Sequence, residues 1–368
     1  MKKCVIASDS FKETLSSKQI ANLFEIEFKK LFPDAVLRKV VLGDGGENTL
    51  EVFANAFPYG KYHEIIVTGP NFQKVNSKYY TYDDIAVIEL AETSGLTLAV
   101  EKNPLKTTTY GVGELIIDAY KKGYKRFYVA LGGSSTNDGG CGLLSALGIK
   151  FLDNHGNEFV PVGETISNIK HIDFSNLKVK DAHFIILSDV KNVMYGPTGA
   201  AHVFAKQKGA TDTEINILDK NLELLNGLFI KSTGADVSNI PGSGAAGGTS
   251  SGMLAFLNAK IVSGIDAILD LIDFDNIIKD ADYVFTGEGK LDNQSFNGKL
   301  ISGVLNRTKK QSIKTVCVCG LNELKEIPND TFYKVFETSG RNIDFEDIKI
   351  NASKYYSNTI KQILVELK

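Results

Sequence analysis

Short apolar runs alternate with amphipathic segments along the whole chain of 368 residues. Several of these runs are continuously apolar, which is typical of parallel strands that are covered on both faces. They predict strands at residues 4–7, 36–42, 64–67, 85–90, 127–131, 184–187, 283–285 and 315–318. Ser16 and Gln19 form a capping-box pattern before the helical stripe of Ile20, Leu23, Phe24, Phe28 and Leu31. A second stripe consists of Val112, Leu115, Ile116, Ala119 and Tyr120. The pattern therefore predicts an α/β fold.

The segment from residue 64 to residue 90 differs from the rest of the chain. Asn71, Asn76 and the pair Asp83 and Asp84 are turn signals between apolar runs, which favours hairpins rather than strand–helix units. We therefore expect a second domain of mixed α/β type. The chain length agrees, because it suggests two or three domains of roughly 100–200 residues each.

Composition and charge narrow the class of protein. Hydrophobic residues make up 43%, charged residues 23% and the net charge is −3, as in ordinary soluble globular proteins. There is no basic excess that would indicate a nucleic-acid partner. No apolar stretch reaches the roughly 18 residues of a membrane span, and the chain start turns polar after four apolar residues. We expect a cytoplasmic protein without a membrane partner.

The four cysteines do not form a metal-binding pattern. Cys317 and Cys319 lie on one face of a predicted strand, but no second pair or nearby histidine completes a zinc set. Cys4 lies in another apolar run, and Cys141 lies within a glycine-rich loop. Buried free thiols are the favoured interpretation.

Carboxylates follow five of the predicted strands: Asp9, Asp44, Asp138, Asp189 and Glu288. Each one alone is better explained as a turn former or helix cap. Together they lie where open α/β sheets bind ligands, just beyond the carboxyl ends of strands. The five acids therefore predict a ligand site.

Two glycine-rich loops are candidates for binding an anion. Residues 132–142 follow a buried strand and contain glycines, hydroxyls, an amide and a carboxylate, which suits the close approach of backbone N–H groups to an anion. Residues 241–248 contain the spacing G-x-G-x-x-G, but the polar segment before them weakens a dinucleotide-binding interpretation. Close helix packing and phosphate contact explain this second loop equally well. A P-loop is excluded, because Asn293 and Leu300 occupy positions where the motif requires glycine and Ser or Thr.

Acids, glycine loops and lysines together suit phosphoryl transfer, which needs a divalent metal, cations and a base or positioning group for the acceptor hydroxyl. Lys12, Lys208, Lys290 and Lys299 are candidate cations. A solvated surface position is the more common state for any one lysine. Lys12 and Lys290 are favoured because each lies close to a strand-end carboxylate.

The motifs resemble those of the type I glycerate kinases, bacterial enzymes that phosphorylate D-glycerate with ATP. The resemblance spans nearly the whole chain, in order. It rests on residues 8–12, 44–47, 132–140, 188–190 with 207–210, 241–248 and 287–294 with 298–299. Lys290 stands where the family usually has Arg, which keeps the charge but loses bidentate geometry. Other departures are Gly43, Asn48 and the run Asn192, Val193 and Met194.

The resemblance implies two α/β domains around a cleft, with ATP, Mg²⁺ and D-glycerate as ligands. One domain would be flavodoxin-like and discontinuous, from residues 1–64 and 280–368, and the second would be mixed α/β, from residues 65–279. The product would be 2-phosphoglycerate, with 3-phosphoglycerate as the alternative. A GHMP-type small-molecule kinase, a nicotinamide-dependent oxidoreductase and a non-catalytic ligand sensor remain other hypotheses. The oligomeric state, including a homodimer, stays open.

Candidate site residues follow from the motifs and the resemblance. The catalytic candidates are Asp189, Asp44, Lys12 and Lys290, and the metal ligands are Glu288 and Asp292. Asp189 or Asp44 would accept the proton of the C2 hydroxyl. The candidates for binding substrate or phosphate are Asp9, Ser10, Gly45, Gly46, Gly133, Ser134, Ser135, Thr136, Asn137, Asp138, Lys208, Gly242, Ser243, Gly244 and Lys299. Whether the loop at 132–140 holds the glycerate carboxylate or the ATP phosphates is left open by the sequence.

Overall fold

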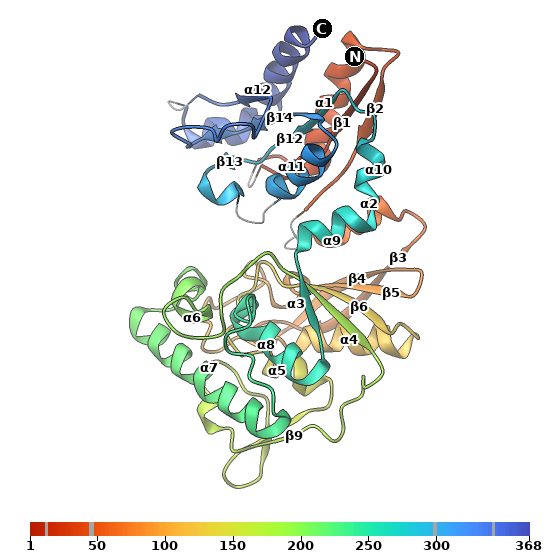
Figure 1. Cartoon of the computed structure of the whole chain (residues 1–368). Coiled ribbons are helices and arrows are strands. Elements are labelled where there is room, and N and C mark those ends of the chain that lie inside the picture. The colour runs from red at the N-terminus through yellow and green to blue at the C-terminus, as the bar shows by residue number, and fades with distance from the viewer. Residues whose placement is uncertain (12–13, 44–47, 297–299, 341–342) are drawn as a thin grey trace. The chain divides into compact units, whose positions relative to one another are not determined.

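The computed structural model describes residues 1–11, 14–43, 48–296, 300–340 and 343–368. The chain forms two compact units (Figure 1). Unit 1 consists of Met1–Asp44 and Ile265–Lys368, and unit 2 is Gly45–Gly264. Among the described residues, none of the helices combines the length and apolar character that crossing a membrane requires.

A discontinuous first unit is present, but the division differs from the expected one at residues 64 and 280. Helix α2 (Thr49–Ala56) lies in unit 2, because the carboxylate of Glu89 accepts hydrogen bonds from the amides of Asn48 and Leu50 at its start. Helices α9 (Gly264–Leu271) and α10 (Phe274–Ile278) lie almost entirely in unit 1. There Arg307 binds the carboxylates of Asp270 and Asp275. These tertiary contacts, which the sequence pattern does not reveal, set the boundaries.

Unit 1 is built on a sheet of five parallel strands in the order β16-β14-β12-β1-β2. Their bounds are Lys334–Glu337, Lys314–Cys319, Tyr283–Thr286, Lys3–Ile6 and Val36–Lys39. Counted within the unit, this order is 2-1-3-4-5, which is the order of flavodoxin-like doubly wound sheets. The chain therefore moves outward from β1 in both directions, which places a switch point between β1 and β12.

Helices cover both faces of this sheet. Strand residues alternate in direction, so Val316 and Val318 join one apolar cluster with α1 (Ser17–Leu31) and α12 (Phe345–Glu366). Cys317 and Cys319 face the other way and pack with α11 (Leu300–Lys310). The predicted capping box at Ser16 and Gln19 begins α1.

Unit 2 contains a six-stranded sheet in the order β11-β10-β6-β5-β4-β3. The bounds are Lys260–Val262, His183–Leu187, Arg126–Ala130, Ile85–Glu89, Lys74–Tyr82 and Lys61–Thr68. The first four strands are parallel, and β4 pairs antiparallel with both β3 and β5. The hairpins predicted for residues 64–90 are therefore present.

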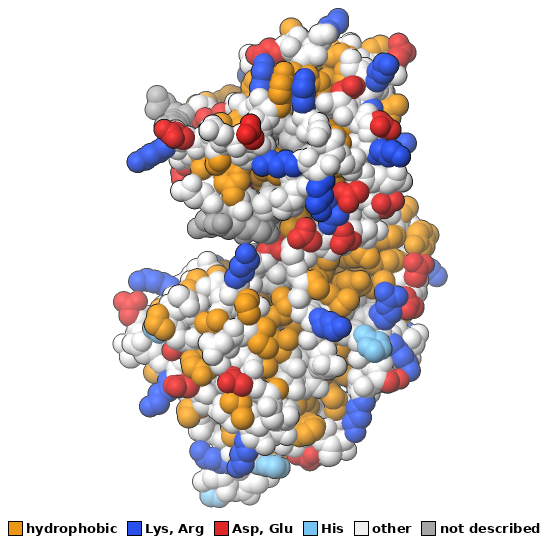
Figure 2. Space-filling model, viewed as in Figure 1, with side chains coloured by type: hydrophobic (Ala, Val, Ile, Leu, Met, Phe, Trp, Pro, Cys, Tyr) orange, Lys and Arg blue, Asp and Glu red, His pale blue; other side chains and the backbone are white. Residues whose placement is uncertain are grey.

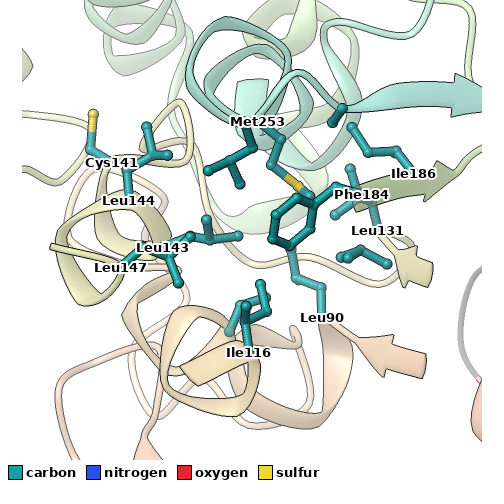
Figure 3. Packing of buried hydrophobic residues seen from close by; sticks show 14 of the residues in the cluster. Leu90, Ile116, Leu131, Cys141, Leu143, Leu144, Leu147, Phe184, Ile186 and Met253 are labelled. Atoms are coloured by element: carbon teal, nitrogen blue, oxygen red, sulfur yellow. The ribbon is translucent and has the colours of Figure 1, made fainter. Parts of the chain in front are cut away.

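The larger core lies on one face of this sheet. Helix α4 (Tyr110–Lys121) contributes the predicted stripe, and the side chains of Leu90, Ile116, Leu143, Phe184 and Met253 meet in it (Figure 3). On the opposite face, the ring of Phe53 in α2 packs against those of Tyr82 and Tyr128. Both faces are thus covered, which explains the continuously apolar strands.

The remaining elements are short, apart from two helices of unit 2. The other helices are α3 (Ala91–Ser94), α5 (Cys141–Ala146), α6 (Ala200–Phe204), α7 (Asp212–Thr233) and α8 (Ala245–Leu257), with 3₁₀ turns at Ile166–Asn168, Lys206–Lys208 and Asn293–Phe296. The other strands are β7 (Lys150–Leu152), β8 (Glu158–Phe159), β9 (His171–Asp173), β13 (Lys290–Leu291) and β15 (Leu321–Asn322).

The predicted fold class is confirmed, and all eight predicted strands are present within a few residues of their expected ends. Three strands of the two main sheets were not predicted. The edge strands β11 and β16 are short and only partly buried. Strand β4 contains Asn76, which was expected to mark a turn and instead pairs with Ile66 of β3. All four cysteines are buried and free, as expected. Acidic and basic side chains are interspersed on the face shown in Figure 2, in keeping with the small net charge.

Candidate functional site

The strand-end acids do not share one sheet. Asp9 and Glu288 follow strands of unit 1, whereas Asp138 and Asp189 follow strands of unit 2. Each unit therefore has its own set of polar residues at the carboxyl ends of its parallel strands. The fifth acid, Asp44, lies outside the described residues.

In unit 1 these residues surround a cavity of about 570 Å³, which we call the acidic pocket. Its lining combines three carboxylates and one lysine with several apolar side chains. The predicted residues Asp9, Ser10, Glu288, Lys290 and Asp292 are all in its wall. The other lining residues are Phe11, Thr14, Gly289, Gly320, Leu321, Thr338, Ser339, Gly340, Ile343, Ile348, Ala352 and Tyr355.

The loops after β1 and β12 are tied together at the switch point. The amide of Asp9 donates to the carbonyl of Gly287 at 2.9 Å, and the hydroxyl of Ser8 donates to the same oxygen at 3.0 Å. A Cβ atom on Gly287 would lie 1.8 Å from the carbonyl oxygen of Val318. Only glycine fits this position, because β14, which contains Val318, passes directly beside it.

The charged groups of the pocket differ in their surroundings. Lys290 forms an ion pair with Glu323 at 2.7 Å, and this hydrogen-bonded carboxylate raises the pKa of Lys290. The Asp9 carboxylate accepts a 2.7 Å hydrogen bond from the amide of Ser10. Asp292 begins a turn in which its amide donates to the hydroxyl of Ser295 at 2.9 Å. In the parts of the chain that the structure describes, no cluster of three or more His, Cys, Asp or Glu residues forms a ready metal cage.

In unit 2 the polar residues form a second group, which we call the glycine-loop site: residues 132–142, Lys208 and residues 241–250. The loop after β6 is held by the loop after β5. The amide and hydroxyl of Ser135 both donate to the carbonyl of Ser94, at 2.9 and 2.8 Å. The amide of Leu96 donates to the carbonyl of Gly133 at 2.9 Å. Ser94 was not predicted as a site residue, although it lies four residues after a predicted strand, at the end of α3.

Lys208 is buried against this loop, with only 3% of its surface exposed. Its ammonium group donates to the carbonyl of Thr136 at 2.6 Å and to the hydroxyl of Ser134 at 3.3 Å. Burial lowers the pKa of Lys208 to about 7, against the opposing effect of the Asp138 carboxylate. No ion pair to Lys208 is formed within the described part of the chain. The sequence did not show that this lysine is buried.

Asn137 and Asp138 are both fully buried in the same loop. Neither polar atom of the Asn137 side chain has a hydrogen-bond partner. The Asp138 carboxylate accepts four hydrogen bonds, from the amides of Thr109, Gly140 and Gly142 and from the hydroxyl of Thr109. Asp138 thus anchors its own loop to the start of α4. Burial still raises the pKa of Asp138.

The second glycine loop packs directly on the first. Ala246, Gly247 and Gly248 have positive φ angles, and a Cβ atom on Gly247 would lie 2.1 Å from the carbonyl oxygen of Thr136. The amide of Gly139 donates to the carbonyl of Gly247 at 3.0 Å. This contact accords with close packing, one of the two expected roles of the loop.

The predicted residues Gly242, Ser243 and Gly244 are bonded within unit 2. The amide of Gly244 donates to the carbonyl of Asn192 at 2.9 Å, and the carbonyls of Gly242 and Ser243 accept the hydroxyl of Ser250. The segment before Pro241 contains α7 and turns but no strand. The weak match to a dinucleotide fingerprint is therefore not supported by its structural context.

Asp189 lies past the end of β10, where its carboxylate accepts a 3.0 Å hydrogen bond from the amide of Gly264. Lys12, Asp44, Gly45, Gly46 and Lys299 lie outside the described residues.

Sequence reasoning missed residues whose position depends on the fold. Glu89 anchors the start of α2, next to the motif at 44–47. Ile348, Ala352 and Tyr355 line the acidic pocket from α12. Their spacing of i, i+4 and i+7 marks one face of a helix, so this signal was present in the sequence.

Comparison with known proteins agrees with these motifs. A model of the glycerate kinase family matches residues 4–368. A glycerate kinase from Bacillus subtilis strain 168 is 37% identical over all of this chain and 98% of its own length. A glycerate 2-kinase from Escherichia coli strain K12 is 40% identical over 86% of this chain and 85% of its own length.

A crystal structure gives the same result at the level of the fold. It is described as a glycerate kinase 2 from Salmonella typhimurium LT2, and it aligns with a TM-score of 0.86 and 35% identity. The alignment covers 100% of this chain and 98% of that chain. With a family model along nearly its whole length and relatives of this kind at 37–40% identity, the chain belongs to the glycerate kinase family.

Proposed function

We propose that this protein transfers the γ-phosphoryl group of ATP to the C2 hydroxyl of D-glycerate, which gives 2-phosphoglycerate and ADP. Family membership supports a kinase that acts on glycerate. The Escherichia coli relative named glycerate 2-kinase, at 40% identity, supports transfer to C2 rather than C3. A cytoplasmic location, where ATP is supplied, is part of the same proposal.

The observation that carries the proposal is the glycine-loop site. Lys208 is a buried cation without an ion pair among the described residues, and Asn137, next to Thr136 in the same loop, has an amide without hydrogen-bond partners. Buried polar groups are normally paired, because an unmade hydrogen bond costs about 1–3 kcal/mol. A small hydroxy acid supplies a carboxylate for the cation and both donors and acceptors for the amide.

Asp189 is our candidate for the group that receives the hydroxyl proton, with Asp44 as the alternative. In this reaction the C2 oxygen forms a bond to the γ-phosphorus, the bond between that phosphorus and the bridging oxygen of ADP breaks, and the hydroxyl proton moves to a carboxylate. Asp189 follows β10, the strand next to β6 and its glycine loop. Its position at this edge supports the role.

Mg²⁺ fits the residues of the acidic pocket. Glu288 and Asp292 place two carboxylates in one wall, and Mg²⁺ is usually held in proteins by one or two carboxylates together with phosphate oxygens and water. A complete set of protein ligands is therefore not required. The bound ion would neutralise charge on the phosphates. Lys290, in the same lining, would add positive charge, and Lys12 is the alternative candidate for this role.

The test is direct. Purified protein is incubated with Mg²⁺, ATP and D-glycerate, and the products are followed by phosphorus NMR. We expect ADP and a phosphomonoester that enolase consumes without added mutase, because enolase acts on 2-phosphoglycerate. A product that enolase leaves unchanged would refute transfer to C2, and ATP that remains intact would refute the proposed function.

A further inference from the structure

We propose that the acidic pocket of unit 1 is the nucleotide site, with the purine of ATP against the apolar wall formed by α12 and the phosphates at the end that carries the carboxylates. The inference rests on the proposed function for the identity of the nucleotide. It assigns the two substrates to different units: ATP to the acidic pocket, and the glycerate carboxylate to the glycine-loop site.

The topology of unit 1 carries the first step. Doubly wound sheets bind ligands outside the carboxyl ends of their strands, in the crevice where the strand order reverses. In this sheet the reversal lies between β1 and β12. The loops after these two strands supply Asp9, Ser10 and residues 288–292 to the wall of the pocket. The cavity thus lies at the place where the fold favours a ligand.

The apolar wall carries the second step. Ile348, Ala352 and Tyr355 lie on one face of α12, and Phe11 and Ile343 belong to the same cavity. The hydroxyl of Tyr355 donates to the carboxylate of Asp347 at 2.5 Å, which fixes the ring. A flat heteroaromatic base suits such a wall, because ligand sites combine a mostly apolar lining with few polar groups. The volume of about 570 Å³ is sufficient for a nucleotide-sized ligand.

The charged residues of the lining carry the third step. Asp9, Glu288 and Asp292 supply three carboxylates to the pocket, beside Lys290, which pairs with Glu323. Carboxylates together with phosphate oxygens are the ligands that a divalent cation such as Mg²⁺ takes in nucleotide sites. The pocket therefore fits a metal–nucleotide complex better than a free anion such as glycerate.

The glycine-loop site has the opposite character. Its side chains Ser135, Thr136 and Asn137 are at most 1% exposed. Its charged residues are the buried Lys208 and Asp138, and the Asp138 carboxylate already accepts four hydrogen bonds within unit 2. Such closely packed surroundings suit one carboxylate and a hydroxyl rather than a purine with three phosphates. This contrast assigns the small acid to unit 2.

The first experiment measures the binding of Mg²⁺ with the non-hydrolysable analogue AMP-PNP by titration calorimetry. Ala352→Leu adds bulk to the apolar wall, and we expect the Kd to rise at least about tenfold. Ser353→Leu is the matched control, because it makes a similar change at the next, exposed position of α12, and we expect it to leave the Kd unchanged. An unchanged Kd in Ala352→Leu, or an equal loss in the control, overturns the inference. Melting curves of both variants check that they fold.

A second measurement needs no substitution. The wild-type protein is irradiated with 8-azido-ATP and Mg²⁺, and the labelled peptides are identified by mass spectrometry. We expect the label on residues of the acidic pocket, within 343–355 or 320–321, and protection by excess ATP. Label within 132–142 or 241–250 overturns the inference. Failure to phosphorylate glycerate, with label still in the pocket, would refute the proposed function and leave the nucleotide site supported.

Discussion

Asn137 and Asp138 are neighbours in the chain and both fully buried, but their side chains differ in the partners that they find. The Asp138 carboxylate accepts four hydrogen bonds, and the Asn137 amide makes none. A buried carboxylate that collects several N–H donors stabilises its loop. A buried amide without partners destabilises the protein and is retained where it meets a ligand.

Substitution of these neighbours is expected to separate stability from binding. Asp138→Asn places an NH₂ group against N–H donors and should lower the free energy of unfolding by about 2–4 kcal/mol. Asn137→Ala should change the free energy of unfolding by less than about 1 kcal/mol, because the Asn137 amide makes no hydrogen bond within the protein. It should raise the KM for glycerate at least about tenfold, because the ligand loses its hydrogen bonds to this amide. Urea denaturation and steady-state kinetics measure both effects. A large loss of stability in Asn137→Ala would show that this side chain has a structural role instead.

If Lys208 binds glycerate as proposed, we expect this binding to depend on pH. With a pKa of about 7, its amine is largely neutral at about pH 8. A bound carboxylate favours the charged form and raises this pKa, so binding should take up a proton, and affinity should increase as the pH falls from about 8 to about 7. Below that range the lysine is charged before binding, and the uptake should disappear.

Calorimetry at about pH 8 in two buffers of different ionisation enthalpy measures this uptake. We expect up to about one proton per glycerate in the wild type and none in Lys208→Met. Lys206→Met, at an exposed position of the same 3₁₀ turn, is the control and should behave as the wild type. Equal uptake in Lys208→Met would assign the proton to another group.

At the scale of single residues, the sequence predicted many of the residues that line the acidic pocket, but not the hydrogen-bond partners of the buried polar side chains. Asp9, Ser10, Glu288, Lys290 and Asp292 were expected near one another and do line one pocket. Nothing in the order of residues shows that Lys208 is buried or that Asp138 bonds to the amide of Thr109, because these contacts join segments 29 or more positions apart. Such partners follow only from the fold.

Among the elements, the contact between the two glycine loops determines the geometry of unit 2. Gly247 has a φ of +65°, and its Cα approaches the backbone of Thr136 and Asn137 so closely that a Cβ atom would lie 2.1 Å from a carbonyl oxygen. The atoms that a Cβ atom would meet belong to the backbone, which cannot move aside as the end of a flexible side chain can. The loop at 241–248 therefore fixes the position of the loop at 132–142 by close packing, and it is also a candidate part of the site.

Gly247→Ala is accordingly expected to lower the free energy of unfolding by at least about 2 kcal/mol, from the strained φ angle and the overlap with backbone atoms. Gly227→Ala is the control, because it lies in α7 with no atom within 4 Å of an added Cβ. It should be neutral or stabilising by up to about 1 kcal/mol. Denaturant unfolding of both variants measures the difference. Equal stability of the two would show that the loops can separate without cost.

Most helices and strands could be predicted from the sequence. A helix with one buried face shows a periodic apolar stripe, and a strand that is buried on both faces shows a continuous apolar run. The strands at the centre of each sheet, such as β6 and β12, are short apolar runs and were found. The edge strand β16 has one exposed residue followed by three half-buried residues and carries a weaker signal. The first boundary between the units lies earlier in the chain than residue 64, because α2 belongs to unit 2. Its start is held there by Glu89 of β5, and this long-range contact has no local signal in the sequence.

For the whole molecule, a parallel sheet in unit 1 and a mixed sheet in unit 2 each carry polar residues at the carboxyl ends of their parallel strands, which we propose as two ligand sites. One contains a cavity with an acidic and an apolar wall, and the other contains closely packed polar loops around a buried lysine. A chain divided in this way can bind its two substrates through separate contacts. Each substrate is then expected to order mainly the unit that holds it.

Hydrogen exchange with mass spectrometry tests this division. Mg²⁺ with AMP-PNP should slow amide exchange in peptides that cover 287–292 and 345–355, and D-glycerate alone should slow it in peptides that cover 92–96 and 132–142, because bound ligands suppress local opening. Peptides from β7 and β9, which lie in neither site, serve as internal controls. Protection of 132–142 by the nucleotide alone, with 287–292 unchanged, would reverse the assignment of the two substrates. Protection of every peptide by either ligand would indicate stabilisation of the whole chain rather than binding to one unit.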